Sequence, residues 1–303
     1  MGGARPLAGV ALRKEDVPIR LSNRLGAVAG FIEKGARVAD VGTDHGMLPV
    51  FLAENGLARR IVASDVSAAS LASALRCAER HRVADRIEFV VAPGLEGVAP
   101  GMAVGCLGGA AVSAGGCYEA GAADSNWRER PKTLEDGDFS DASAGAGTGT
   151  GAADSPIDTV VIAGVGGETI MEVLAGAPWV RSRGVRLVLQ PQTKTDRLCL
   201  WLRENGYAIL DARLARDSGR LYVVMLAGAG RIGSIGGELP EKELLSKLRD
   251  RRDPLFAAFI DSLIAKASRA SDGLRRADSR DLPGMLRKLE ELHILKEGVV
   301  CQM

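Results

Sequence analysis

Short apolar runs alternate with helical patterns between Arg37 and Ala227. The helical patterns span about 48–55, 68–81, 168–174 and 195–205. The runs that are typical of buried strands are RVADVG, RIVASD, RIEFVVA, DTVVIAG and VRLVLQ. Nearly continuous Val, Ile and Leu strands that alternate with helices predict an α/β domain, in which helices cover both faces of a parallel sheet.

Two further apolar runs, YAILDARLA and LYVVMLA, are separated by the turn-rich link RDSGR, Arg216 to Arg220. So short a link predicts an antiparallel hairpin, because a parallel connection needs a longer crossover. We expect this hairpin at one edge of the sheet.

The chain after the hairpin changes character. GAGRIGSIGGELP, from Gly228 to Pro240, is typical of a linker. Beyond it, apolar residues recur at helical spacing with breaks near Pro254 and Pro283, which predicts a short helix and then two longer ones. We expect about fifteen charged residues to join the last two helices. The two helices would then fold back on each other as an antiparallel helical hairpin. The predicted organisation is an N-terminal extension (1–20), an α/β domain (21–228) and a C-terminal helical domain (238–303).

A segment of unusual composition interrupts the α/β pattern. Between Gly97 and Pro156 the chain has 13 glycines, 3 basic residues and 8 acidic residues. Such a sequence has little apolar surface to bury and much entropy to lose on ordering. We therefore expect a disordered insertion at about 99–156, remote from any ligand crevice.

Composition restricts the classes of function. The formal net charge is +1, but the chain outside Gly97–Pro156 has 36 basic and 30 acidic residues, a modest excess that is compatible with a polyanionic partner. The five cysteines form no CxxC pair and the three histidines no HExxH motif, so no metal site is expected. The scattered cysteines and the lack of an apolar run of ~18 residues favour a reduced, cytoplasmic chain with no membrane span.

The stretch VADVGTDHGMLP places the pattern D-x-G-x-D-x-G at the end of the first strand, in Asp40, Gly42, Asp44 and Gly46. Glycines let such a turn approach a ligand closely, but an acidic side chain at Asp44 would repel the pyrophosphate of a dinucleotide. A ligand with a cationic amino-acid end, such as S-adenosylmethionine, favours carboxylates here. The alternative is a glycine turn without any ligand.

Asp65 ends the second strand, where an acidic side chain can accept hydrogen bonds from both hydroxyls of an adenosine ribose. The alternative role is that of N-cap for the next helix. The fourth strand ends in IAGVGGE and the fifth in LQPQ, so the candidates that would hold a substrate base are Gly164, Gly166, Gly167, Gln190 and Gln192. Each of these segments is also compatible with an ordinary strand exit.

These residues resemble a family, the bacterial tRNA (adenine-22-N1)-methyltransferases. The resemblance covers most of the chain outside the first twenty residues and the insertion. It is carried by LSNRL (21–25), ADVGTDHGMLP (39–49), ASDV (63–66), GLEGV (94–98), IAGVGGETI (162–170), LVLQPQ (187–192), WLRENGYAI (201–209) and DPLF (253–256). It implies a Rossmann-like class I methyltransferase sheet with a C-terminal helical hairpin, S-adenosyl-L-methionine as cofactor, and tRNA as partner.

The resemblance also implies roles for single residues. Residues 40–46 would surround the methionine part of the cofactor, Asp65 would hold the ribose, and Arg24 would meet a substrate phosphate. The predicted cofactor site comprises Asp40, Gly42, Thr43, Asp44, His45, Gly46, Asp65, Val66, Pro93 and Gly94. His45 is equally compatible with a purely structural role, and Arg24 with that of a solvated helix residue.

Two departures from the family pattern concern recognition more than chemistry. The family usually has an acidic residue before the Gly-Leu of GLEGV, near the adenine amino group, and Pro93 stands there. Its Gly-Pro beyond the ribose carboxylate is Ala69-Ser70 here. The alternatives to a tRNA adenine-N1 methyltransferase are a methyltransferase of the same fold with another target, and an RNA adaptor that binds the cofactor without transferring methyl groups. An oxidoreductase is disfavoured by Asp44.

Overall fold

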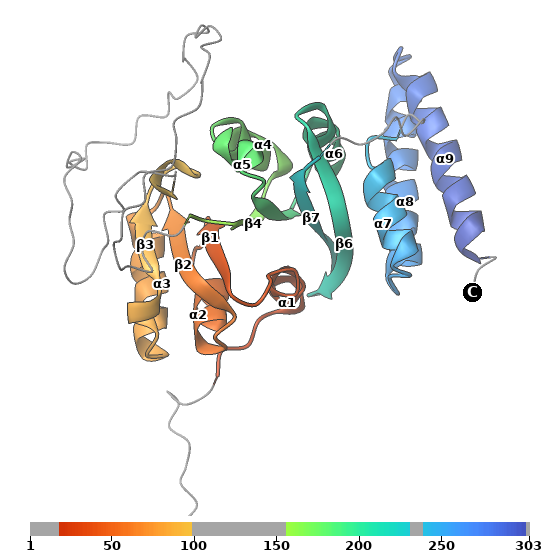
Figure 1. The fold of residues 1–303 in the computed structure, drawn as a ribbon. Helices are drawn as coiled ribbons and strands as arrows, with labels where there is room; N and C mark the ends of the chain where they lie inside the picture. Colours follow the sequence, from red (N-terminus) through yellow and green to blue (C-terminus); the bar gives the residue numbers. More distant parts are fainter. Residues whose placement is uncertain (1–17, 99–155, 231–238, 301–303) are drawn as a thin grey trace, which may run out of the picture.

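The computed structural model describes residues 18–98, 156–230 and 239–300, and the expected insertion lies almost wholly outside this part of the chain. Its centre is a seven-stranded sheet with helices packed around it (Figure 1). The strands are β1 (Ala36–Val41), β2 (Ala58–Asp65), β3 (Glu88–Val91), β4 (Thr159–Val165), β5 (Arg186–Pro191), β6 (Tyr207–Asp217) and β7 (Arg220–Ala229). The helices are α1 (Asn23–Ala29), α2 (Met47–Glu54), α3 (Ala68–Arg80), α4 (Gly167–Ala175), α5 (Trp179–Ser182), α6 (Thr195–Glu204), α7 (Lys242–Asp250), α8 (Phe256–Arg276) and α9 (Leu282–Val300).

The sheet has the strand order β3-β2-β1-β4-β5-β7-β6. The strands β1 to β5 are parallel to one another, and β7 runs antiparallel to both β5 and β6. The order reverses between β1 and β4, and in such open α/β sheets ligands bind outside the carboxyl ends of the strands at this switch point. The prediction of a Rossmann-like sheet with an antiparallel edge hairpin is confirmed.

The hairpin turn explains the antiparallel pairing of β6 with β7. Asp217 pairs with Arg220, so only Ser218 and Gly219 form the turn, and both have positive φ angles (49° and 78°). Two left-handed residues match the twist of the strands that they join, which makes this the favoured two-residue hairpin connection.

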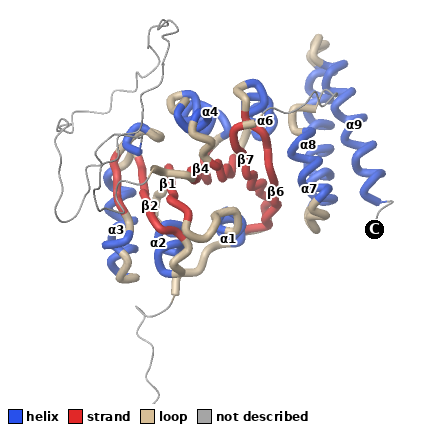
Figure 2. Tube along the Cα trace, in the orientation of Figure 1, coloured by secondary structure: helices blue, strands red, loops and turns tan. Residues whose placement is uncertain are grey.

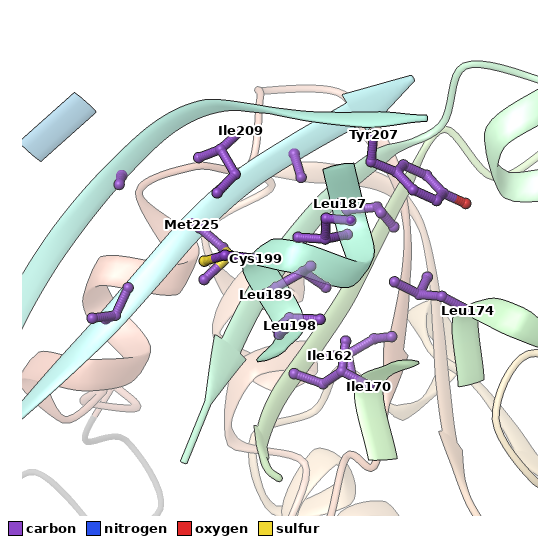
Figure 3. Packing of buried hydrophobic residues seen from close by; sticks show 14 of the residues in the cluster. Ile162, Ile170, Leu174, Leu187, Leu189, Leu198, Cys199, Tyr207, Ile209 and Met225 are labelled. Atoms are coloured by element: carbon purple, nitrogen blue, oxygen red, sulfur yellow. The ribbon is translucent and has the colours of Figure 1, made fainter. Parts of the chain in front are cut away.

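Two hydrophobic clusters, one on each face, hold the helices to the sheet. Alternate strand residues point to opposite faces, so Ala39, Val160 and Leu187 belong to one cluster and their neighbours Val38 and Val161 to the other. Helices lie on both sides of the strands, α4 and α6 on one side and α1 and α2 on the other (Figure 2). Figure 3 shows the first cluster, in which Ile162, Leu187 and Leu189 of the strands pack with Ile170, Leu174 and Leu198 of α4 and α6. Burial on both faces accounts for the continuous apolar runs of the strands.

The C-terminal helices match the predicted series of one short helix and two long ones, but the link between the last two was misjudged. Only residues 277–281 separate α8 from α9, against about fifteen in the prediction. The charged residues before Ala277 continue α8, because they lie on its exposed face while Ala267 and Ser271 are buried beneath them. A charged helical face resembles a loop when composition alone is considered.

The short helix α7 attaches this segment to the sheet. Leu244, Leu245 and Leu248 are buried in the same cluster as β5, β6 and β7. The Glu243 carboxylate accepts a hydrogen bond from the Ile209 backbone N–H (3.1 Å) and Asp253 from that of Leu214 (2.9 Å). The C-terminal helices therefore pack against the sheet as well as against each other. The helix α7 and its turn cover the edge strand β6, beside which α7 and α8 lie in Figure 1.

Candidate active site

The turn after β1 is built from residues in left-handed backbone conformations. Gly42, Asp44 and Gly46 have φ angles of 75°, 51° and 70°. The N–H groups of Gly42 and Thr43 donate to the Ser64 carbonyl oxygen (2.8 and 3.0 Å), which fixes the turn against β2. A Cβ atom at Gly46 would lie 2.8 Å from Cβ of Ala74, so this glycine also allows α3 to pack closely.

Asp40 is the buried acid of this turn, with an exposed fraction of 4%. The Thr43 hydroxyl donates a hydrogen bond to its carboxylate at 2.8 Å. Burial raises the pKa of Asp40 to about 6; the Thr43 hydrogen bond opposes the rise and the nearby Asp65 charge adds to it. Because a cationic ligand would favour the ionised form, the site of Asp40 is suited to a ligand with a positive group.

Asp65 links the ends of two strands. Its carboxylate accepts hydrogen bonds from the backbone N–H of Asp44 (3.1 Å) and from that of Ser67 (2.9 Å). Asp65 does not cap α3, since Ser67 is the N-cap and its hydroxyl accepts from the Ser70 N–H (3.2 Å). The carboxylate is therefore held in place at the carboxyl end of β2, beside the turn that contains Asp40.

Asp44 and His45 lie at the exposed rim of the turn, with side chains 68% and 69% exposed. His45 Nδ1 lies 3.1 Å from the Ser73 hydroxyl of α3, and Nε2 lies 3.7 Å from the Asp44 carboxylate. These contacts orient the imidazole along the surface of α3.

An apolar patch adjoins Asp65. Val66 is 71% exposed and Val91, paired in register with Asp65, is 48% exposed. Pro93 is exposed at the end of the same strand, and Gly94 has a φ of 57°. Exposed valines next to a carboxylate provide an apolar surface and a hydrogen-bond acceptor, the pair that an adenosine requires. Val91 was missed in the sequence, and its only signal is that it occupies the last position of a strand.

The three glycines at the end of β4 and the start of α4 have different functions in the fold. Gly164 has a φ of 85° and is exposed, and a Cβ atom there would lie 3.4 Å from Nη1 of Arg24. Gly166 is the N-cap of α4. A Cβ atom at Gly167 would lie 2.8 Å from the carbonyl oxygens of both Thr193 and Lys194. Gly167 is thus required by close backbone packing, while Gly164 is exposed next to Arg24.

Gln190 and Gln192 end β5, and the structure separates them. Gln192 is exposed, whereas Gln190 is fully buried. The Gln190 side-chain oxygen accepts a hydrogen bond from Nη1 of Arg24 (2.7 Å), and its nitrogen donates to the Pro191 carbonyl oxygen (3.1 Å). Gln190 is thus bonded to Arg24 and to the backbone and presents no exposed surface, whereas Gln192 does, and a base contact by either glutamine stays a prediction.

Arg24 is brought to this place by α1, whose N-cap Ser22 accepts a hydrogen bond from the Leu25 N–H. The helix contacts β5, β6 and β7 (Figure 1). The Arg24 guanidinium also lies over the ring of Tyr222, 5.8 Å from its centroid. Tyr222 was not predicted as a site residue, since it stands in β7 nearly 200 positions from Arg24 and only the fold brings the two together.

The site consequently has two sides at the carboxyl ends of the strands. One side joins Asp40 and Asp65 to the exposed valines, and the other joins Gly164 to Arg24 and Tyr222. Within residues 18–98, 156–230 and 239–300 there is no cluster of three side chains suited to bind a metal ion. No helix in the same ranges is long and apolar enough to cross a membrane.

The sequence profile of one family, described as "Methyltransferase domain", matches residues 21–114 and 132–225. These ranges include both sides of the site and cover more than half of the chain. The chain belongs to the methyltransferase domain family. This membership agrees with the strand order and with the resemblance noted in the sequence.

Individual relatives of known name support the same resemblance. The chain is 25% identical over 212 residues to the tRNA (adenine(22)-N(1))-methyltransferase of Bacillus subtilis (strain 168), a match that covers 70% of this chain and 66% of that protein, just under two thirds of its length. The crystal structure of the B. subtilis M1A22 tRNA methyltransferase TrmK is 22% identical and has a TM-score of 0.61, covering 93% of this chain and 99% of that one.

A second solved structure, M. capricolum TrmK in complex with the natural cofactor product S-adenosyl-homocysteine, is 17% identical with a TM-score of 0.63. It covers 92% of this chain and 99% of its own. At this level of identity the similarity demonstrates a common fold, which extends through the C-terminal helices.

Proposed function

We propose that this protein transfers a methyl group from S-adenosyl-L-methionine to N1 of adenine 22 in tRNA. The observation that carries the proposal is the pair of carboxylates, Asp40 and Asp65, at the carboxyl ends of β1 and β2 in a chain of the methyltransferase domain family. The relative that is 25% identical, and the fold shared with the TrmK structures, support tRNA as the substrate class. A tRNA substrate assigns the activity to the cytoplasm.

The residues of the candidate site fit this cofactor. Asp40 offers a negative charge for the positive methionine end, and Asp65 offers the acceptors for ribose hydroxyls. Among the described residues, a Cβ atom at Gly42 would meet only Val165, at 3.9 Å, so the turn leaves room for a ligand to approach its backbone. Thr43, Asp44, His45 and Gly46 complete the turn, while Val66, Pro93 and Gly94 border the adenine side.

S-adenosylmethionine supplies an electrophilic methyl group, and the N1 lone pair of adenine accepts it without a strong base. The protein must therefore hold N1 in line with the transferred carbon and keep water away, so positioning dominates the chemistry. If the base leaves a stacked arrangement, contacts with the enzyme must offset an unstacking cost of a few kcal/mol. Gly164, Gly166 and Gln192 border the place for the base, and Arg24 lies beside it as a phosphate contact.

We assign residues 21–228 to the methyltransferase domain and 238–303 to a helical domain that grips the RNA. The exposed basic side chains Lys266, Arg269 and Arg275 of α8 support a contact with a polyanion. The segment from Glu238 to Met303 has 13 basic and 12 acidic residues, so such a contact depends on local placement of charge and not on the net charge.

The test is methyl transfer itself. Purified protein, radiolabelled S-adenosylmethionine and a tRNA transcript with adenine at position 22 should give labelled N1-methyladenosine, and a transcript with guanine at that position should remain unlabelled. Binding of cofactor and tRNA without any transfer would support the adaptor function instead.

A further inference from the structure

Arg24 differs from most partly buried arginines of this protein in the partners that hold it. Arg37, Arg60 and Arg186 each pair with a carboxylate, on Asp158, Glu88 and Glu33 respectively. The guanidinium of Arg24 instead contacts the Gln190 amide oxygen at 2.7 Å and the Tyr222 ring at 5.8 Å. In the described part of the chain no carboxylate lies within ion-pair distance of it. Arg24 thus keeps an uncompensated positive charge.

The neutral partner of Arg24 is itself firmly fixed. Gln190 is fully buried, and its side-chain nitrogen donates to the Pro191 carbonyl oxygen at 3.1 Å. That bond defines which end of the amide faces Arg24, since the nitrogen is occupied elsewhere. A buried glutamine destabilises the fold unless the oxygen and the nitrogen of its amide are both hydrogen-bonded. In Gln190 both atoms have a partner.

The two contacts constrain the guanidinium in different ways. The hydrogen bond from Nη1 to Gln190 engages one of the five N–H donors of Arg24, and the Tyr222 ring covers part of its face. In the described part of the chain no other hydrogen bond of the guanidinium is found, and a Cβ atom at the exposed Gly164 would lie 3.4 Å from Nη1. A planar cation with a fixed plane and free donors is suited to a phosphate group.

We infer that Gln190 and Tyr222 are positioning residues, which hold Arg24 with its charge free for a phosphate of the RNA next to the target adenine. Gln190 serves this purpose because its amide accepts a hydrogen bond without neutralising the cation. Tyr222 restricts the guanidinium from the other side. This inference rests on the proposed function, since it assumes that the substrate of the site is a polynucleotide.

Gln190→Glu is the sharpest variant, because it keeps an acceptor next to Arg24 and adds a negative charge. We expect the KM for tRNA to rise about 10- to 100-fold with a smaller change in kcat. We also expect the slope of log affinity against log salt to fall in magnitude by about 0.7–0.9, the change for one lost phosphate contact. A role of Gln190 in packing alone would alter the melting temperature and leave the salt slope unchanged.

Gln190→Met and Tyr222→Leu test the position of the Arg24 guanidinium separately from its charge. Each removes one contact of the guanidinium and leaves the charge in place, so the KM for tRNA should rise less than in Gln190→Glu, while the salt slope stays near that of the unsubstituted protein. Tyr222→Phe keeps the ring, so its KM for tRNA should stay near that of the unsubstituted protein and below that of Tyr222→Leu.

Arg24→Gln should reproduce the loss of affinity and the reduced salt slope of Gln190→Glu. The matched control is Arg183→Gln, an exposed arginine at the end of α5 next to the amino end of β5, for which both quantities should stay unchanged. Melting temperature and cofactor affinity are measured on every variant. If Gln190→Glu does not fold, Arg24→Gln and Gln190→Met still test the inference.

Two results would overturn the inference. One is a salt slope in Arg24→Gln equal to that in Arg183→Gln. The other is a fall in kcat with unchanged KM in Gln190→Met, which would mean that Gln190 contacts the base. Failure of the proposed function is distinguishable, since the unsubstituted protein would then methylate no tRNA, while the salt dependence of tRNA binding would still test the role of Arg24.

Discussion

The backbone N–H of Asp44 donates a hydrogen bond to the Asp65 carboxylate at 3.1 Å. This bond joins the turn after β1 to the end of β2, so the two segments that form the cofactor side of the site are held as one unit. Because Ser67 caps α3, the acid is not needed as the helix cap. Its position beside the turn is consistent with the ligand role that we propose.

Replacing Asp65 with Ala should weaken the binding of S-adenosylmethionine by about 100-fold or more. The reason is that two hydrogen bonds to a charged acceptor would be lost, each typically about 1.5–3 kcal/mol. Titration calorimetry measures the affinity. Asp85→Ala, which removes an exposed carboxylate from the short helix η1 (Ala84–Arg86), is the control. Equal affinities for the two variants would contradict the assignment of the ribose to Asp65.

Asp40→Asn should change how stability depends on pH. Burial raises the pKa of Asp40 from 3.8 to about 6 in the folded protein. The stability contributed by the protonated carboxyl is therefore fully present below about pH 4 and is lost as the pH rises through about 6. Asn cannot ionise, so the cofactor-free variant should equal the original protein at pH 4 and exceed it at pH 8, by up to about 3 kcal/mol.

The same residue should link cofactor binding to protons. If the Asp40 carboxylate faces the positive end of the cofactor, affinity should fall about tenfold between pH 7 and pH 5 in the original protein, since the carboxyl is then largely protonated. In Asp40→Asn this pH dependence should vanish. Parallel pH profiles of affinity in the two proteins would place the cation elsewhere.

Gly46→Ala should destabilise the fold by about 1–3 kcal/mol, because its φ is 70° and the added Cβ would lie 2.8 Å from that of Ala74. Gly35→Ala is the matched control: its φ is 84°, but a Cβ there meets no atom of the described residues within 4 Å. Chemical denaturation of both variants isolates the packing cost. If the two lose equal stability, the contact between this turn and α3 is not a constraint.

The exposed basic residues of α8 provide a separate test of RNA binding. Replacing Lys266, Arg269 and Arg275 with Gln should lower the affinity for tRNA and reduce its salt dependence, while cofactor affinity is kept. These residues are exposed, so folding should be unaffected. Substitution suits this question better than truncation after Gly230, which would also remove α7 and uncover β6. Unchanged binding would leave α8 a purely structural helix.

The sequence predicts the strands, the hairpin and the first turn because these depend on local patterns. Strands such as β4 are buried on both faces and appear as unbroken apolar runs, and Ser218-Gly219 is a turn signal that needs no tertiary information. Asp40 and Asp65 are predictable for a related reason. Each stands at the carboxyl end of a parallel strand, and the topology brings those ends together.

The remaining features depend on contacts between distant segments. Nothing in LQPQ indicates that Gln190 is buried, because a glutamine at a strand end is usually exposed. Its burial follows from the approach of α1, which supplies Arg24 from 166 positions away. The pairing of Arg24 with Tyr222 likewise exists only once β7 is inserted next to β5. The local sequence could not show which of the two glutamines, Gln190 or Gln192, is buried against Arg24 and which is exposed.

The most direct test of the central claim is to locate the methyl group. Transfer RNA is incubated with the protein and S-adenosylmethionine, digested, and analysed by mass spectrometry for methylated nucleosides and for the position of the modification. Our account predicts one N1-methyladenosine, at position 22, which is absent with Asp65→Ala at low cofactor concentration. A methyl group on another nucleotide, or none in a protein that binds both the cofactor and tRNA, would contradict it.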